Sequence, residues 1–148
     1  MNERSRGYVL RLDVAAPAQA LWRALVDPAR ITEWYARDAR VDARAGGSYK
    51  VRLLPDLERD ARIDIFQPPT RLRLIYMPSA EMPSPDGVII DDFILDASGD
   101  STRLCLLGSG FPRTSEYSEF LRQVQSTWTV ALARLKSRVE KEALDAAR

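Results

Sequence analysis

Histidine, the side chain most often used for general acid–base catalysis, is absent from this 148-residue chain. Without histidine, no imidazole can serve as a general base, activate a serine or cysteine nucleophile, or bind zinc. The single cysteine, Cys105, alternates with Leu104 and Leu106, and we interpret it as a small core residue of a strand. A lone cysteine also excludes an internal disulfide and favours a reducing compartment.

Two groups of carboxylates could do acid–base or metal chemistry. Asp91 and Asp92 are adjacent, and neighbours in a strand point to opposite faces, so the two cannot converge on one atom. One of them could face inward, where burial would raise its pKa. Asp56, Glu58 and Asp60 have alternate spacing that suggests calcium, but the segment lacks the glycine and closing glutamate of a calcium loop. We interpret it as a solvated turn and predict no metal site and no cofactor.

Alternating apolar residues predict a sheet that would position these groups. Period-two segments occupy 7–14, 39–42, 48–54, 60–66, 71–76, 88–96 and 102–108, and residues 97–100 form a hairpin turn between the last two. Two short helices are expected at 18–26 and from Pro28, the second capped by Asp27. Residues 78–87, rich in Pro and Ser, form the longest irregular segment and could hold a partner or a ligand gate.

A long amphipathic helix is predicted from Ser115 onward, where glycine and proline are absent. Apolar residues recur there at steps of three and four: Tyr117, Leu121, Val124, Trp128, Ala131, Leu135 and Val139. Ser115, Ser118 and Glu119 offer capping groups at its start, and the tail after about Lys141 is expected to fray or overhang the sheet. Only this helix is large enough to cover the apolar face of the sheet.

The predicted fold class is therefore α+β: a curved antiparallel sheet of about six or seven strands, two short amino-terminal helices and a long carboxy-terminal helix across the sheet. We expect residues 1–148 to form a single domain. No signal peptide and no apolar run of bilayer length is visible, so a cytoplasmic location is expected. A net charge of +1 gives no global field toward nucleic acid or an anionic membrane.

Several short motifs occur along this order of elements. They are Ala16-Pro17, residues 21–28, Ile31 with Trp34, residues 42–49 around Gly46-Gly47, residues 68–72, residues 102–104 with Gly110-Phe111, and residues 128–136. From about Val9 to Glu140 the chain resembles the START-like (SRPBCC, helix-grip) superfamily, and within it the bacterial family of activator of Hsp90 ATPase homologues. Such proteins usually carry glycine immediately before the tryptophan of the last helix, where this chain has Thr127.

The resemblance implies a cavity between the apolar face of the sheet and the long helix. The candidate ligand-binding residues are Trp34, Tyr49, Phe66, Leu74, Tyr76, Phe93, Leu106, Phe120, Val124 and Trp128. The alternative for each is that it simply fills the core, because aromatic stripes are more often core than ligand box. Gln125 and Thr129 are further polar candidates, for which a surface position is an equal alternative.

Three functions remain open at this point. The leading hypothesis is non-catalytic binding of a small apolar or amphipathic ligand in that cavity. The second, implied by the family's name, is a protein-interaction module that acts as a co-chaperone or stress-response partner. The third is an enzyme resembling the polyketide cyclases of this fold, in which tyrosines, arginines and carboxylates would have to do the chemistry. No catalytic constellation is recognisable, so the sequence favours a non-catalytic protein. It does not give the oligomeric state.

Overall fold

The computed structural model describes residues 5–78 and 88–147 of the chain. Most of the irregular segment expected at 78–87 therefore lies outside the described residues. Seven strands and three helices follow one another along the rest. The elements are β1 (Ser5–Val14), α1 (Ala18–Val26), α2 (Pro28–Trp34), β2 (Asp38–Val41), β3 (Ser48–Leu54), β4 (Leu57–Gln67), β5 (Arg71–Tyr76), β6 (Ile90–Ser98), β7 (Ser101–Pro112) and α3 (Ser115–Ala146).

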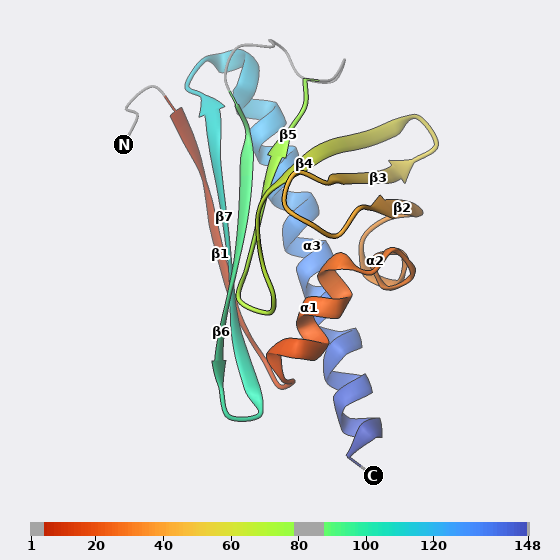
Figure 1. The fold of residues 1–148 in the computed structure, drawn as a ribbon. Helices are drawn as coiled ribbons and strands as arrows, with labels where there is room; N and C mark the ends of the chain where they lie inside the picture. The colour runs from red at the N-terminus through yellow and green to blue at the C-terminus, as the bar shows by residue number, and fades with distance from the viewer. Residues whose placement is uncertain (1–4, 79–87, 148) are drawn as a thin grey trace.

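The strands form one antiparallel sheet in the order β1-β7-β6-β5-β4-β3-β2. The sheet curves, and α3 runs along one side of it while α1 and α2 pack against α3 at the same side (Figure 1). This arrangement confirms the predicted α+β helix-grip fold. The first strand pairs with the last one, so β1 and β2 are the two edges of the sheet.

Two hydrogen bonds set the geometry of the turn between the two short helices. The Asp27 side chain accepts a hydrogen bond from the Ala29 N–H at 3.0 Å and so begins α2, as predicted. The indole N–H of Trp34 donates to the carbonyl of Ala24 at 2.8 Å. These bonds fix the angle at which the chain turns from α1 into α2.

Helix α3 buries one stripe of apolar residues, as its sequence predicts. The buried positions are Tyr117, Val124, Trp128, Ala131, Leu132, Leu135 and Val139. Of the two outcomes predicted for its tail, fraying or overhanging the sheet, fraying is not seen, because the helix continues to Ala146 and Glu142 forms an ion pair with Arg30 of α2. The predicted capping is also wrong. Thr114 occupies the cap position without a side-chain bond, and the Ser118 hydroxyl instead accepts a hydrogen bond from Arg6 of β1 at 2.9 Å.

Two further interpretations change because strand register assigns side chains to faces. Cys105 pairs with Arg11 and Ile94 in the sheet, between two inward-pointing leucines, so it lies half-buried on the outer face and is not a core residue. The turn after β3 is shorter than expected, because β4 already begins at Leu57. Glu58 and Asp60 are thus strand residues, and Glu58 forms an ion pair with Arg52 across the strands at 2.9 Å.

Candidate functional site

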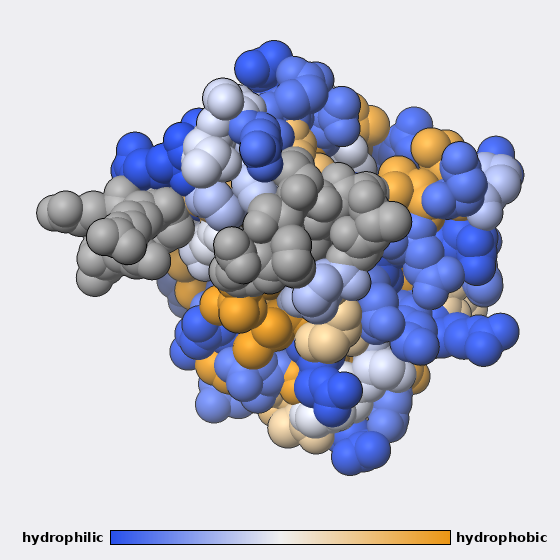
Figure 2. Space-filling view, turned by 90° about the horizontal axis from the view of Figure 1, so that it is seen from above, coloured by the Kyte–Doolittle hydropathy of each residue, from blue (hydrophilic) through white to orange (hydrophobic). Residues whose placement is uncertain are grey.

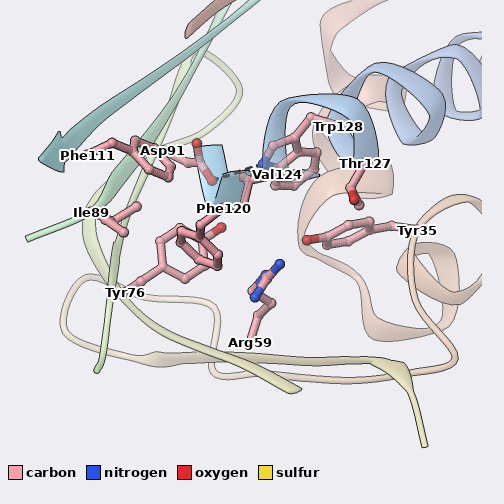
Figure 3. Close-up of a pocket in the computed structure, with 10 residues that line it drawn as sticks. All are labelled: Tyr35, Arg59, Tyr76, Ile89, Asp91, Phe111, Phe120, Val124, Thr127 and Trp128. Carbon is pink, nitrogen blue, oxygen red and sulfur yellow. Dashed lines mark hydrogen bonds between the residues drawn. The ribbon is translucent and has the colours of Figure 1, made fainter. Parts of the chain in front are cut away.

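A pocket opens between α3 and the sheet, and four of the predicted ligand-binding residues line it (Figure 3). The lining residues are Tyr35, Arg59, Tyr76, Ile89, Asp91, Phe111, Phe120, Val124, Thr127 and Trp128. The space between these atoms is about 360 Å³ when the open mouth is included. The pocket itself has room for little more than a water molecule, so a larger ligand requires side chains around it to move.

Asp91 is the buried acid of this pocket, with 1% of its surface exposed. The Tyr8 hydroxyl donates to its Oδ1 at 2.6 Å, and the Trp128 indole N–H donates to its Oδ2 at 3.1 Å. The nearby Tyr76 side chain also lowers the pKa of this carboxyl. Burial raises the pKa of Asp91 to about 6, although these hydrogen bonds and the charge of Arg59 lower it.

The sheet register explains why an acid is tolerated at this place. Asp91 lies on the inner face of β6 opposite Gly108 of β7, and an added Cβ at Gly108 would overlap the ring of Tyr8. The missing side chain therefore leaves room for the Tyr8 ring to lie beside the carboxyl. Asp92 points to the other face, where Arg71 binds its two oxygens at 3.1 and 2.7 Å. The prediction that the adjacent pair cannot converge is confirmed.

Arg59 brings the positive charge of the pocket. It lies on the inner face of β4, opposite the buried Val51 of β3, and reaches toward the centre of the pocket (Figure 3). Its guanidinium carbon is 5.6 Å from the centroid of the Phe120 ring, a cation–π distance. Burial raises the pKa of Tyr35, and the nearby Arg59 charge acts against this rise. The Tyr35 ring in turn stacks on Trp128, with centroids 4.5 Å apart.

The tyrosines around Asp91 are neutral hydrogen-bonding groups. Burial raises the pKa of Tyr8, Tyr35, Tyr49 and Tyr76 above its ordinary value, and the nearby Asp91 charge acts in the same direction. Each therefore keeps its proton near neutral pH. No group of three or more carboxylate or cysteine side chains that could hold a metal occurs among the described residues. The pocket thus offers hydrogen bonds, one acid and one cation inside an aromatic wall.

The ten sequence candidates separate into two layers. Tyr76, Phe120, Val124 and Trp128 line the pocket. The remaining six do not line it: Trp34, Tyr49, Leu74, Phe93 and Leu106 are buried in the core, and Phe66 packs edge-on against Trp22 at 5.4 Å. Tyr49 is held by a hydrogen bond from its hydroxyl to the Leu25 carbonyl at 2.7 Å, so its polar atom is used inside the core. Gln125 and Thr129 are exposed on α3.

Sequence reasoning missed Arg59, Tyr35, Ile89 and Phe111 as pocket residues. A signal for Arg59 does exist, since it lies two residues before Ala61 and four before Ile63 on the apolar side of an alternating strand. Tyr35 directly follows α2, and its direction depends on how that helix ends. Thr127, where the resemblance led us to expect glycine, is exposed at the pocket, and its hydroxyl donates to the Gln123 carbonyl at 2.9 Å.

Most of the surface at this end of the molecule is hydrophilic. Seen along the view of Figure 2, hydrophobic residues come to the surface in a few small groups between charged ones. No helix in the described part of the chain is long and apolar enough to span a membrane.

Comparison with known proteins gives one match in sequence and many in structure. The family model described as activator of Hsp90 ATPase homolog 1-like protein matches residues 15–140. A search of curated proteins gives no match.

Similar solved structures share the fold at low sequence identity. Protein MLL2253 from Mesorhizobium loti superposes with a TM-score of 0.81 at 20% identity, over 92% of this chain and 98% of that one. CalU16 from Micromonospora echinospora gives a TM-score of 0.68 at 24% identity, over 93% and 83%. The Aha1 dimer from Colwellia psychrerythraea gives 0.72 at 18% identity, over 89% and 94%.

Proposed function

Because the chain belongs to the family of activator of Hsp90 ATPase homolog 1-like proteins, we propose that it binds a small amphipathic molecule, without covalent chemistry, between α3 and the sheet. The observation that carries this proposal is the composition of the pocket. Aromatic and aliphatic side chains form most of its wall, and a few polar groups are placed on one side. Ligand pockets in proteins usually have this composition.

The residue types favour binding over catalysis. A nucleophile with an adjacent base is missing among the described lining residues, and both oxygens of Asp91 already accept hydrogen bonds from the protein. An acid held in this way is well suited to fix the position of its neighbours. A proton transfer to a substrate would first require one of these bonds to break.

Ligand entry requires motion at the mouth. Phe120 and Arg59 are half-buried there, and the Arg59 guanidinium lies over the Phe120 ring. Arginine has a long, flexible stem, so its displacement costs less than that of a packed core residue. We therefore expect the pocket to widen when a ligand enters and the backbone of α3 to stay in place.

The test uses displacement of a fluorescent apolar probe, 1-anilinonaphthalene-8-sulfonate, together with native mass spectrometry. Thr127→Trp places a bulky ring at the pocket, and Gln125→Trp places the same ring on an exposed position of α3 outside it. We expect Thr127→Trp to reduce probe binding and Gln125→Trp to leave it unchanged. Equal probe binding by both variants, or no probe binding by the unaltered protein, would refute the proposal.

The second candidate is a protein partner, and the observation that favours it is the family match itself. An Hsp90-type chaperone would be the partner of interest. The discriminating measurement is the ATPase rate of a purified bacterial Hsp90 with increasing amounts of this protein. A saturable stimulation that survives Thr127→Trp would favour the interaction module over the ligand-binding protein.

A further inference from the structure

A second hollow adjoins the candidate pocket on the side of α3 where α2 ends, and we call it the α2–α3 groove. Its lining residues are Trp34, Tyr35, Ser126, Thr127, Val130, Ala131 and Arg134. The space between these atoms is about 570 Å³ when the open side is included. Tyr35 and Thr127 line both the groove and the pocket, so the two hollows meet at these side chains.

We propose that the ligand is a single-chain organic anion that occupies both hollows, with its apolar chain in the pocket and its anionic head at Arg134 in the groove. The inference rests on the proposed function and deepens it by naming the ligand class and its orientation. A carboxylate on an unbranched alkyl chain belongs to this class.

Arg134 is the residue of the groove that can attract an anion. The other two arginines of α3 are engaged, Arg122 with Glu119 at 2.9 Å and Arg138 with Glu33 of α2 at 2.6 Å. Within the part of the chain that the structure describes, Arg134 has no such partner, and no acidic residue lies three or four positions from it along the helix. It is also the one charged side chain among the described residues that line the groove. A single negative charge therefore complements the groove, and guanidinium groups bind carboxylates especially well.

An apolar path leads from Arg134 to the pocket. Val130 lies one turn before Arg134 and has 51% of its surface exposed, and the buried residues Trp34 and Ala131 line the groove beside it. From Thr127 to Arg134 the helix rises by about 10 Å, a distance that an alkyl chain of moderate length spans. Such a chain would cover the exposed valine while its charged head stays at the arginine, in contact with water.

Tyr35 lies where the chain passes from the groove into the pocket. Its ring stacks on Trp34 and on Trp128, with centroids 5.3 and 4.5 Å apart. Figure 3 shows it next to Thr127, at the side of the pocket opposite to Tyr76. Tyr35 is half-buried and directly follows α2, so its side chain can turn toward solvent while the helix stays in place. The two hollows then become continuous, and the alkyl chain takes the place of the ring against Trp128.

The opposite orientation, with the anion inside the pocket, is unfavourable. The carboxyl of Asp91 is buried there and accepts hydrogen bonds from Tyr8 and Trp128. The Arg59 guanidinium already lies over the Phe120 ring and takes part in other interactions. An ionised head in the pocket would lose its water and lie near a carboxylate, whereas the apolar end of a chain has neither cost.

The first experiment compares decanoate with decan-1-ol, which has the same chain length and no charge, as competitors of the fluorescent probe. The affinity of the probe is measured separately for each variant. Arg134→Gln should weaken decanoate binding about threefold to tenfold, the effect of one exposed charge-assisted contact, and leave decan-1-ol binding unchanged. Salt should weaken decanoate binding and spare decan-1-ol, because an exposed charge is screened.

Arg122→Gln is the matched control. Arg122 is also an exposed arginine of α3, but it lines neither the pocket nor the groove, so its replacement should change the binding of neither competitor. Thermal unfolding verifies that each variant is folded. Both substitutions are at exposed positions of the helix, where replacements usually change stability little.

The second experiment tests the orientation on the unaltered protein. Decanedioate carries another carboxylate at the far end of the same chain, the end that is placed in the pocket. It should bind at least about tenfold more weakly than decanoate, because this second charge would be buried without a partner. Hexanoate should also bind at least about tenfold more weakly than decanoate, because its shorter chain buries less apolar surface.

Tyr35→Ala tests the passage between the two hollows. Without the ring at this place, decanoate should associate faster, as measured by stopped-flow mixing and tryptophan fluorescence. Gln125→Ala, a substitution at an exposed position of α3 outside both hollows, should leave the association rate unchanged. An equal or lower rate in Tyr35→Ala would show that the chain does not pass Tyr35 and would overturn the inference.

The outcomes separate the inference from the proposed function. If decan-1-ol displaces the probe but decanoate binds equally well to Arg134→Gln and to the unaltered protein, the inference is overturned and the proposed binding function stands. The same holds if decanedioate binds as tightly as decanoate. No binding of the probe or of either competitor would remove the proposed function itself.

Discussion

Replacing Asp91 by asparagine is expected to change how the stability of the protein depends on pH. Burial raises the pKa of the Asp91 carboxyl from 3.8 to about 6 in the folded protein. Below pH 3.8 the carboxyl is mostly protonated in both the folded and the unfolded chain, so its ionisation does not lower the free energy of unfolding. Between about pH 4 and 6 the unfolded chain releases the proton while the folded protein still holds it, and the folded state loses stability relative to the unfolded one.

The size of this loss follows from the difference between the two pKa values. Roughly two pH units correspond to about 3 kcal/mol, which is a large part of the 5–15 kcal/mol typical of a domain of this size. Asparagine does not ionise, so it lacks this loss. We therefore expect aspartate to become less favourable than asparagine by up to about 3 kcal/mol as the pH rises from 4 to 7.

The assay is urea unfolding of the protein and of Asp91→Asn, side by side at half-unit steps from pH 4 to 7.5. The difference between the two free energies of unfolding isolates Asp91, because all other carboxyl groups are common to both proteins. Tyr8→Phe provides a second comparison. Its hydroxyl hydrogen bond lowers the pKa of Asp91, so removing it should move the upper end of the pH window above 6.

A difference in stability that stays constant from pH 4 to 7.5 would refute this reasoning. It would mean that Asp91 titrates alike in the folded and unfolded chain, and that its burial is compensated by its hydrogen bonds in full. A window that moves downward in Tyr8→Phe would contradict the role given to that hydroxyl.

Three further substitutions test the frame around the pocket by urea unfolding. Leu74→Ala leaves a cavity beneath the fully buried inner face of β5 and should cost about 2–5 kcal/mol; a loss below 1 kcal/mol would contradict the packing described. Gly110→Ala should destabilise by more than about 1 kcal/mol, because φ is +90° there and an added Cβ would overlap the Val88 carbonyl; an unchanged midpoint would show that the strand can shift. Asp27→Ala removes the cap of α2 and should cost about 1 kcal/mol, whereas Asp27→Asn should retain most of the stability.

The fold could be predicted because its elements carry local signals. Ala18–Val26 and Ser48–Leu54 have the predicted bounds, and Asp27 caps the second helix as expected. The stripe of α3 is visible in its spacing alone. The ends of α3 were predicted less accurately. They depend on the hydrogen bond from Arg6 to Ser118 and the ion pair of Glu142 with Arg30, which join residues far apart in the chain and leave no local pattern in the sequence.

The sequence predicted that the candidate site lies between the sheet and the long helix, but it did not separate the residues that line the pocket from those that fill the core. Composition places Trp34 and Tyr49 among aromatic residues near the helix, but the backbone carbonyls of α1 that bind their polar atoms cannot be identified from sequence. Arg59 was assigned no face, because the turn before β4 was expected to reach Glu58. Its inward position follows only once the strand is extended back to Leu57 and pairs with Val51.

The pairing of the first strand with the last has a consequence for how the chain folds. Val14 ends β1 opposite Thr102 of β7, and Arg6 reaches Ser118 of α3, so the partners of the amino-terminal strand lie near the other end of the chain. Contacts that close such long loops form late, and proteins rich in them fold slowly. On the ribosome β1 would have to wait until nearly the whole sheet has been synthesised. The hydrogen bond from Tyr8 of β1 to Asp91 would then be among the last contacts of the molecule to form.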